Sequence, residues 1–153
     1  MTFDRSAIAE LIYRYAELID EGDFAGVGEL LADAVITIDG NDREYRGADQ
    51  IRRFYEHSTR RYPEGTPLTK HVMSNVIITE GEGGGSGEGG TAASRSYYTV
   101  FQAVPGELVL QPIIAGRYRH RFACTDGQWH ITGFHLIVDL LGELGSHLLF
   151  ELS

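Results

Sequence analysis

The order of the secondary-structure patterns limits the fold of this chain more than any other feature: helical segments come first, and long strand-like segments follow. The spacing of apolar residues predicts helices over residues 4–19, 24–31 and 48–61. Alternating and β-branched patterns predict strands over residues 35–39, 69–79, 92–104, 108–122 and 129–139. Helices gathered on one side of a sheet form an α+β layer fold, so we expect three N-terminal helices packed in a curved, mostly antiparallel sheet.

Two segments fall outside this pattern. Residues 80–90 (EGEGGGSGEGG) are too rich in glycine to form the core of a strand, and we expect a flexible connection there. The tail, residues 140–153, is apolar but interrupted by Gly142 and Gly145, and we expect it to cap a pocket mouth or to pack on a neighbouring subunit. With 153 residues the chain has the size of one domain, and residues 1–153 are expected to fold as one.

The charge and the cysteine count argue against several classes of function. The formal charge of −9 disfavours binding to nucleic acid or to an anionic membrane surface, since both need a concentrated basic face. No run of residues is long and apolar enough to cross a bilayer. Cys124 is the only cysteine, which rules out an intrachain disulfide and a cysteine-based zinc site. The chain begins with an amphipathic helical pattern and not with a secretory signal, so a cytoplasmic location is expected.

His71 is the first candidate for chemistry. It lies on the predicted strand 69–79 and shares a face with Met73 and Asn75. Both faces of this strand are largely apolar, so we expect it to be covered on both sides. An imidazole that is partly desolvated and has a carboxylate partner can accept a proton near neutral pH. The alternative is a core histidine whose ring is satisfied by a backbone carbonyl.

Asp20 is the carboxylate best placed to be that partner. It stands at the end of the first predicted helix, and Asp23 is the better N-cap for the next helix, which leaves Asp20 without a local role. Tyr15 lies five residues earlier on the apolar stripe of the same helix, so its hydroxyl is expected to point inward and to need a partner. A turn aspartate and an aromatic core filler are the simpler interpretations of these two residues.

The strand predicted over 108–122 supplies an inward face with polar groups. Its alternate positions hold arginines that must face solvent or another subunit, namely Arg117, Arg119 and Arg121. The opposite face carries Tyr118 and His120 and has the composition of a pocket wall. His135, on the last strand, has an ambiguous orientation. The remaining histidines are expected to be peripheral: His57, His130 and His147.

The sequence holds no motif for a metal, a phosphate or a covalent nucleophile. Six histidines and many carboxylates could build a metal site, but no HxH or HExxH spacing is present. The glycine run lacks the Lys-Ser/Thr end of a phosphate-binding loop, and there is no GxSxG elbow. We therefore expect a site that uses neither a metal nor a cofactor.

Four segments together resemble the SnoaL-like branch of the NTF2-like superfamily. They are ELIYRYAELIDEGDFAGVGELLADAVITIDG, YRGADQIRRFY, LTKHVMSNVIIT and AGRYRHRFACTDGQWHITGF. The resemblance covers about residues 4–139 and implies a curved sheet wrapped around helices, which together form a cone with a deep apolar pocket. Within the superfamily the chain is most similar to the group of scytalone dehydratase, lindane dehydrochlorinase and bile-acid dehydratase.

The resemblance also implies site residues. In that group an aspartate at the end of the first helix pairs with a histidine on the strand after the third helix, and the matching residues are Asp20 and His71. The bile-acid dehydratase type has a tyrosine five residues before the aspartate, which corresponds to Tyr15. The chain departs from the dehydrochlorinase type, which has a lysine at that position and an arginine where Cys124 falls. It departs from the scytalone type, which has an asparagine where Tyr118 falls.

These observations predict a cofactor-independent lyase of the dehydratase type that acts on a small hydrophobic, cyclic molecule. His71, oriented by Asp20, removes a proton beside a carbonyl or activated carbon. Tyr15 polarises the carbonyl or assists the leaving hydroxyl, and His120 or Tyr118 acts as the acid. The residues expected to bind substrate are Tyr118, Met73, Asn75, Phe54, Tyr98 and His135.

Two other functions fit the same sequence. One is an isomerase or polyketide cyclase, and the other is a non-catalytic ligand-binding protein or a subunit similar to a dioxygenase small subunit. Because the fold hosts all of these, the fold alone does not set the function. We expect a small hydrophobic ligand, no nucleic-acid or membrane partner, and assembly as a homodimer or homotrimer.

Overall fold

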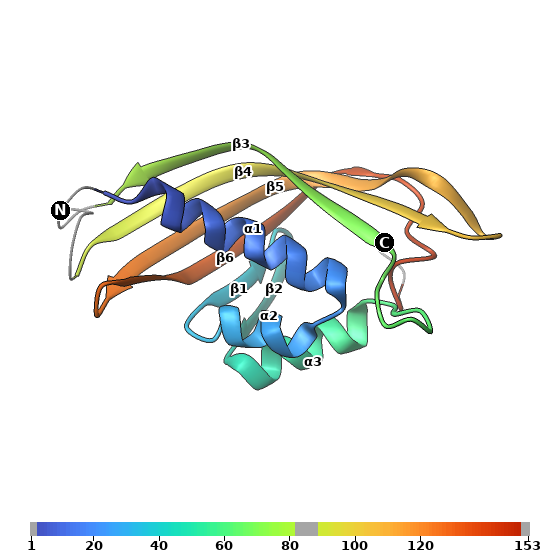
Figure 1. The fold of residues 1–153 in the computed structure, drawn as a ribbon, viewed down its shortest axis with the longest axis horizontal. Helices are drawn as coiled ribbons and strands as arrows, with labels where there is room; N and C mark the ends of the chain where they lie inside the picture. The colour runs from blue at the N-terminus through green and yellow to red at the C-terminus, as the bar shows by residue number, and fades with distance from the viewer. Residues whose placement is uncertain (1–2, 82–88, 151–153) are drawn as a thin grey trace.

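The computed structural model describes residues 3–81 and 89–150 of the chain. Within these residues, three helices lie on one face of a curved sheet of six strands (Figure 1). The helices are α1 (Arg5–Glu21), α2 (Phe24–Leu30) and α3 (Ala48–Ser58). The strands are β1 (Val35–Ile38), β2 (Asn41–Arg46), β3 (Thr69–Glu80), β4 (Thr91–Val104), β5 (Leu108–Thr125) and β6 (Gln128–Leu141). The predicted α+β fold is confirmed.

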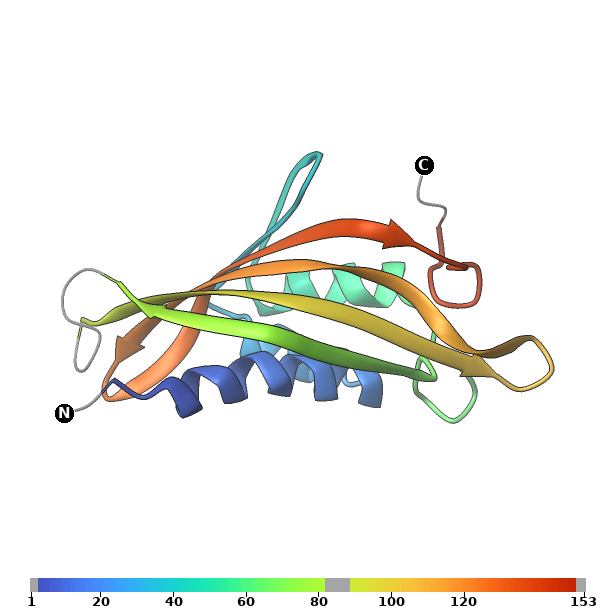
Figure 2. The same ribbon diagram turned by 90° about the horizontal axis from the view of Figure 1, so that it is seen from above.

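The sheet is mixed, with the strand order β2-β1-β6-β5-β4-β3. Strand β1 runs parallel to β6, and all other neighbouring strands are antiparallel. Strands β3 to β6 form a meander whose long strands twist across the helices (Figure 2). Helix α1 lies along the sheet against β3 and β6, whereas α2 packs on α1 and α3. The apolar core fills the space between the helices and this face of the sheet.

Helix α1 is held in place by a single apolar stripe. Ile12, Tyr15 and Ile19 recur at helical spacing, and each is at most 2% exposed. The helix ends at Gly22, whose left-handed backbone (φ 75°) lets its N–H group bond to the carbonyl of Ile19. A Cβ atom at this position would lie 2.1 Å from the carbonyl oxygen of Gly65, so the close approach of the two backbones requires glycine.

Two neighbouring aspartates make different contacts, and the predicted capping role of Asp23 is confirmed. Asp23 caps α2, and its carboxylate accepts a hydrogen bond of 2.9 Å from the N–H group of Gly26. Asp20 lies in the last turn of α1, and its carboxylate reaches across to β3. Because the cap is supplied by Asp23, the carboxylate of Asp20 is available for a long-range contact.

Strand β3 corrects the expectation of a strand covered on both sides. It is the last strand of the sheet, so its free edge has no neighbouring strand within the described residues. On its outer face Val72 and Ile77 are 46% and 45% exposed. The outer face of β3 is therefore uncovered despite its apolar residues, and the inner face of the strand packs on α1.

A bulge in β3 corrects the predicted position of Asn75. The pairing of β3 with β4 shifts between Ser74 and Ile77, and Asn75 adopts a left-handed backbone there (φ 53°). The extra residue leaves Asn75 exposed and turns Val76 toward the core. Simple alternation along the sequence cannot detect this change of face.

A second bulge sets the orientation of His135, which the sequence left ambiguous. In the pairing of β5 with β6, strand β6 carries one extra residue between Ile131 and Gly133. The strand beyond the bulge therefore turns Phe134 inward, where it is 1% exposed, and His135 outward. His135 instead shares a hydrogen bond of 2.7 Å with the hydroxyl of Thr37 on β1.

The C-terminal segment packs against the end of α3. This helix ends at Ser58, before the predicted end at residue 61, because Thr59 is extended and forms a β-bridge with Leu148. The N–H group of Leu149 donates a hydrogen bond of 3.0 Å to the carbonyl of Ser58. Strand β6 extends to Leu141, so the tail is shorter than predicted. Residues 151–153 of the tail, and residues 82–88 of the expected flexible connection, lie outside the described residues.

Candidate active site

A histidine–carboxylate pair joins β3 to the end of α1. His71 Nδ1 lies 2.7 Å from Asp20 Oδ1, and the backbone N–H group of His71 donates to Asp20 Oδ2 at 2.8 Å. The hydroxyl of Thr69 donates a third hydrogen bond to Asp20, at 2.9 Å. The side chains of His71 and Asp20 are 6% and 11% exposed. Because a carboxylate only accepts hydrogen bonds, Nδ1 carries the proton and Nε2 is left as the basic nitrogen.

His71 lines a small apolar cavity of about 150 Å³ between the helices and the sheet. Of the predicted residues, His71, Tyr15, Tyr118, Phe54 and Tyr98 line this cavity. The C-terminal segment adds further walls that include Leu144, His147 and Leu148. An apolar cavity of about this volume accepts one benzene-sized ring. The cavity therefore suits a single small ring or the reacting end of a larger molecule.

Tyrosine side chains from α1, α3 and β5 contribute hydroxyl groups to the cavity lining. The hydroxyls of Tyr15 and Tyr55 form a hydrogen bond of 2.7 Å, and the ring of Tyr118 lies 6.0 Å from that of Tyr15. Burial raises the pKa of Tyr15 well above its usual value, and the neighbouring Tyr55 and Tyr118 raise this pKa further. Burial also raises the pKa of Tyr118 well above its usual value. These phenols remain neutral near pH 7 and act as hydrogen-bond donors and acceptors.

Tyr98 forms a flat part of the wall. Its ring stacks on that of Tyr118 with 4.1 Å between the ring centroids, and its hydroxyl donates a hydrogen bond of 3.1 Å to the carbonyl of Ile137. This hydroxyl passes over Gly116, because a Cβ atom on that residue would lie 2.7 Å from it. Burial raises the pKa of Tyr98 to about 12.

The structure does not place His120 with the pair. Its ring is 2% exposed and stacks on Phe134 with 4.4 Å between the ring centroids, so it lies in the core and does not line the cavity. Burial lowers the pKa of His120 to about 3. A histidine with this pKa carries no acidic proton at neutral pH, which corrects its predicted role as the acid.

Three predicted substrate-binding residues also lie outside the cavity. Met73 packs against the core from β3, whereas Asn75 is exposed in the β3 bulge. His135 is on the outer face of the sheet, 3.7 Å from the carboxylate of Asp39. The two bulges account for Asn75 and His135, since each shifts the inward and outward positions by one residue.

Tyr55 and His147 line the cavity, although the sequence analysis did not assign either residue to the site. Tyr55 is 6% exposed and holds the hydroxyl of Tyr15, although its place on α3 predicts only a buried aromatic residue. His147 was expected to be peripheral, but it is 8% exposed and its ring centroid lies 6.5 Å from that of His71. Its position between Leu144 and Leu148 in an apolar segment was the only available sign of burial.

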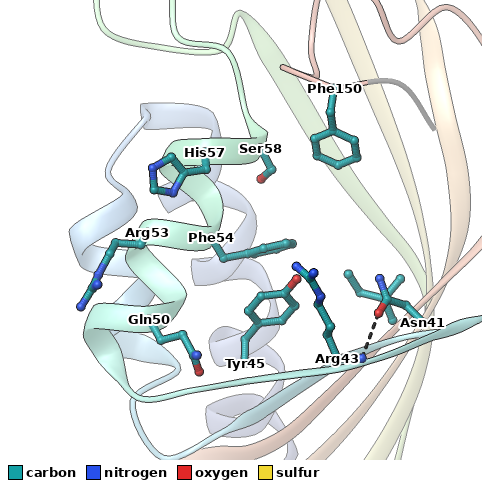
Figure 3. Close-up of a pocket in the computed structure, with 10 residues that line it drawn as sticks. Asn41, Arg43, Tyr45, Gln50, Arg53, Phe54, His57, Ser58 and Phe150 are labelled. Atoms are coloured by element: carbon teal, nitrogen blue, oxygen red, sulfur yellow. Dashed lines mark hydrogen bonds between the residues drawn. The ribbon is translucent and has the colours of Figure 1, made fainter.

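An outer pocket of about 670 Å³ adjoins the cavity (Figure 3). The two spaces share four lining residues, namely Ile38, Phe54, Ser58 and Phe150. The outer pocket is more polar, with Arg43 and Gln50 among its walls. Phe54 and Tyr45 pack their rings together with 4.3 Å between centroids at the boundary. A ligand could therefore place one ring in the inner cavity and extend past Phe54 into the outer pocket.

Residues 3–81 and 89–150 contain neither a cluster of metal ligands nor a membrane-spanning helix. Within this part of the chain, no three side chains of His, Cys, Asp or Glu gather closely enough to hold a metal ion. None of the helices described there is long and apolar enough to span a membrane.

Comparisons with known proteins agree with this fold. The family described as "SnoaL-like domain" matches residues 2–135. An NTF2-like protein with a cystatin-like fold from Novosphingobium aromaticivorans is 24% identical, with a TM-score of 0.67 over 88% of this chain and 81% of its own. ActVI-ORFA from Streptomyces coelicolor is 12% identical, with a TM-score of 0.68 over 88% of this chain and 96% of its own.

A third solved structure points to a different kind of protein on the same fold. It is assigned as the beta subunit of an aromatic-ring-hydroxylating dioxygenase from Novosphingobium aromaticivorans. It is 18% identical, with a TM-score of 0.65 over 90% of both chains. No curated protein matches the sequence significantly. At these identities the solved structures establish the fold alone.

Proposed function

Because this chain belongs to the SnoaL-like family, we propose that it is a cofactor-independent lyase of the dehydratase type, acting by proton abstraction on a small, cyclic hydrophobic substrate. One observation carries the proposal: the hydrogen bond of 2.7 Å between His71 and Asp20 leaves the basic nitrogen of a nearly buried imidazole beside an apolar cavity. A histidine with only a structural role does not need a carboxylate partner that accepts three hydrogen bonds.

The geometry suggests the following chemistry. His71 Nε2 accepts the proton from the carbon next to a carbonyl, and Asp20 stabilises the imidazolium that forms. The electron pair of the broken C–H bond forms the carbon–carbon double bond while the bond to the neighbouring hydroxyl breaks. His71 then passes this proton to the leaving hydroxyl, which departs as water. Tyr15 and Tyr118 donate hydrogen bonds to the oxygen atoms without losing their own protons.

The test uses 3-hydroxycyclohexanone, whose dehydration gives an enone with ultraviolet absorption. We expect the His71→Ala and Asp20→Asn variants to lose about 10²–10⁴-fold in rate, the usual contribution of a positioned base. Asp23→Asn is the matched control, because asparagine is an equally good helix cap and the rate should be unchanged. A His71→Ala variant that dehydrates the substrate at the wild-type rate would refute the proposed base.

An isomerase or cyclase would use the same proton abstraction. The exchange of α-hydrogen atoms of cyclohexanone for deuterium in D2O reports this shared step alone. Exchange that requires His71, together with conversion of 3-cyclohexenone to 2-cyclohexenone and no dehydration, would assign an isomerase instead.

The dioxygenase-subunit alternative predicts no exchange and a stable complex with a large subunit; it is supported by the likeness to a solved beta subunit.

A further inference from the structure

His147 is the second imidazole at the cavity wall, and the mechanism above does not use it. It lies on the C-terminal segment, across the cavity corner from His71, with 6.5 Å between the ring centroids and 63° between the ring planes. Its Nδ1 atom is fully enclosed and has no hydrogen-bond partner among the described residues. Because Nδ1 is enclosed, a ligand in the cavity can reach only Nε2, so Nε2 must carry the N–H group if the neutral ring is to donate a hydrogen bond there.

The main chain around His147 is held in a fixed position. The carbonyl of Ser146 accepts hydrogen bonds from Gln102 Nε2 at 3.0 Å and from the Tyr62 hydroxyl at 2.5 Å. The carbonyl of His147 itself accepts a hydrogen bond of 2.8 Å from the N–H group of Arg60. Gln102 is only 1% exposed, so this anchor is part of the core. The imidazole is therefore presented to the cavity by a rigid segment.

The surroundings of His147 keep its ring neutral. Burial lowers the pKa of His147 to about 4; the nearby His71 also lowers it, and Asp20 opposes the shift. A neutral imidazole has one N–H donor and one acceptor nitrogen. When His71 takes up a proton, its new positive charge disfavours a second charge on His147 still further. His147 can thus donate a hydrogen bond to an oxygen atom but does not transfer its proton.

We infer that His147 is a further catalytic residue, which donates a hydrogen bond to the carbonyl oxygen of a small monocyclic ketone while His71 removes a proton from the adjacent carbon. The inference rests on the proposed function and narrows its substrate class. The C–H bond breaks, its proton moves to His71 Nε2, and its electron pair shifts toward the carbonyl oxygen, where negative charge builds up. A preorganised neutral donor at that oxygen stabilises the charge with no reorganisation during the reaction.

The size and walls of the cavity favour this substrate class. A volume of about 150 Å³ admits one six-membered ring. A ring there would contact Leu144, Leu148 and Val100, which offer no hydrogen bonds from their side chains. The carbonyl oxygen of the ring then has His147, the tyrosine hydroxyls and the hydroxyls of Ser58 and Thr59 as its available partners.

The first measurement detects the hydrogen bond without any reaction. Cyclohexanone is bound to the His71→Ala variant, which lacks the base, and its carbonyl stretching band is recorded by infrared spectroscopy. We expect a shift to lower frequency, as for a carbonyl that accepts a hydrogen bond. The shift should be lost in the double variant His71→Ala, His147→Leu and partly restored with His147→Gln, whose amide is also a donor. An equal shift in all three variants, or no binding of cyclohexanone, would overturn the inference.

The second measurement is the deuterium exchange of cyclohexanone by the protein with His71 intact. We expect His147→Leu to reduce the exchange rate about 10²–10³-fold, the usual effect of removing one donor to a developing oxyanion. His130→Gln, away from the cavity, is the matched control and should exchange as wild type. Unchanged exchange in a folded His147→Leu protein overturns the inference but leaves the role of His71 intact. Failure of the proposed function appears differently, as exchange that does not depend on His71.

Discussion

At the residue scale, the site depends on how two aspartates near the end of α1 share their roles. Asp23 takes the capping role, and Asp20 is therefore free to hold His71. This pairing was predictable, because the helix signals around Gly22 are local and the resemblance links the two positions. His147 was not predictable in the same way. Its neighbour His71 is distant in sequence, and only the folded C-terminal segment brings the two rings together.

A pH-dependent stability is expected from His120. Its folded pKa of about 3 lies below the usual value of 6.5, so the unfolded chain binds a proton that the folded state does not. The contribution of His120 to the free energy of unfolding is therefore fully present above pH 6.5. It falls by about 1.4 kcal/mol per pH unit as the pH drops toward 3. Between pH 7 and pH 5, His120 should account for a loss of about 2 kcal/mol.

The variant His120→Leu should lack this part of the pH dependence, because leucine takes up no proton. Urea unfolding at pH 7 and pH 5 measures the difference in the free energy of unfolding. His147, whose pKa of about 4 is lowered in the same direction, stays in place and keeps its own contribution. If His120→Leu loses as much stability at pH 5 as the wild type does, His120 is not a buried neutral histidine.

At the scale of the elements, sequence patterns predicted correctly which segments are helices and which are strands. They predicted less well which side of a strand each residue faces. The three helices and the long strands were predictable because each has a strong period of its own. The helix α3 ends early because Thr59 pairs with Leu148, a contact that no local signal announces. The predicted face of β3 was wrong at Asn75 and the orientation of His135 on β6 stayed open, since a bulge shifts the alternation without leaving a clear sequence mark.

The contact between β5, β6 and the stacked tyrosines depends on Gly116. A Cβ atom there would lie 2.0 Å from the carbonyl oxygen of Ile137 and 2.7 Å from the hydroxyl of Tyr98. We expect Gly116→Ala to destabilise the fold by about 1–3 kcal/mol, as overpacking does, and to displace Tyr98 from the cavity wall. Thermal unfolding measures the change in stability.

The matched control is Gly133→Ala on β6. Its Cβ atom would lie 3.4 Å from the nearest atom, the Cβ of Arg121, which is an ordinary van der Waals contact. The stability of this variant should stay within about 0.5 kcal/mol of wild type. If both alanine variants unfold at the wild-type temperature, the close approach at Gly116 does not constrain the sheet.

At the scale of the whole molecule, the inner cavity and the outer pocket make one two-part binding space with Phe54 at the boundary. Removal of this ring should join the two volumes. We expect Phe54→Ala to shift the ratio of the dissociation constants for cyclohexanone and the bicyclic ketone 1-tetralone by roughly tenfold in favour of the larger ligand. Isothermal titration calorimetry measures both constants.

Phe54→Leu provides a milder variant in case the alanine protein is unstable, and it should shift the ratio in the same direction. Tyr45→Ala is the control, because Tyr45 packs on Phe54 but lines only the outer pocket. A ratio that does not change in either Phe54 variant would mean that Phe54 does not limit the size of the ligand.

The bulges in β3 and β6 also affect how residue roles are transferred between relatives. Each bulge absorbs one residue inside a strand, and the positions after it point to opposite sides from those that continuous alternation would give. A relative without the same bulge would need an alignment gap within the strand, where gaps are usually disfavoured. Ungapped columns would then equate an inward residue such as Phe134 with an outward one. Comparisons of pocket residues across this family should therefore be anchored on side-chain direction before residue identity.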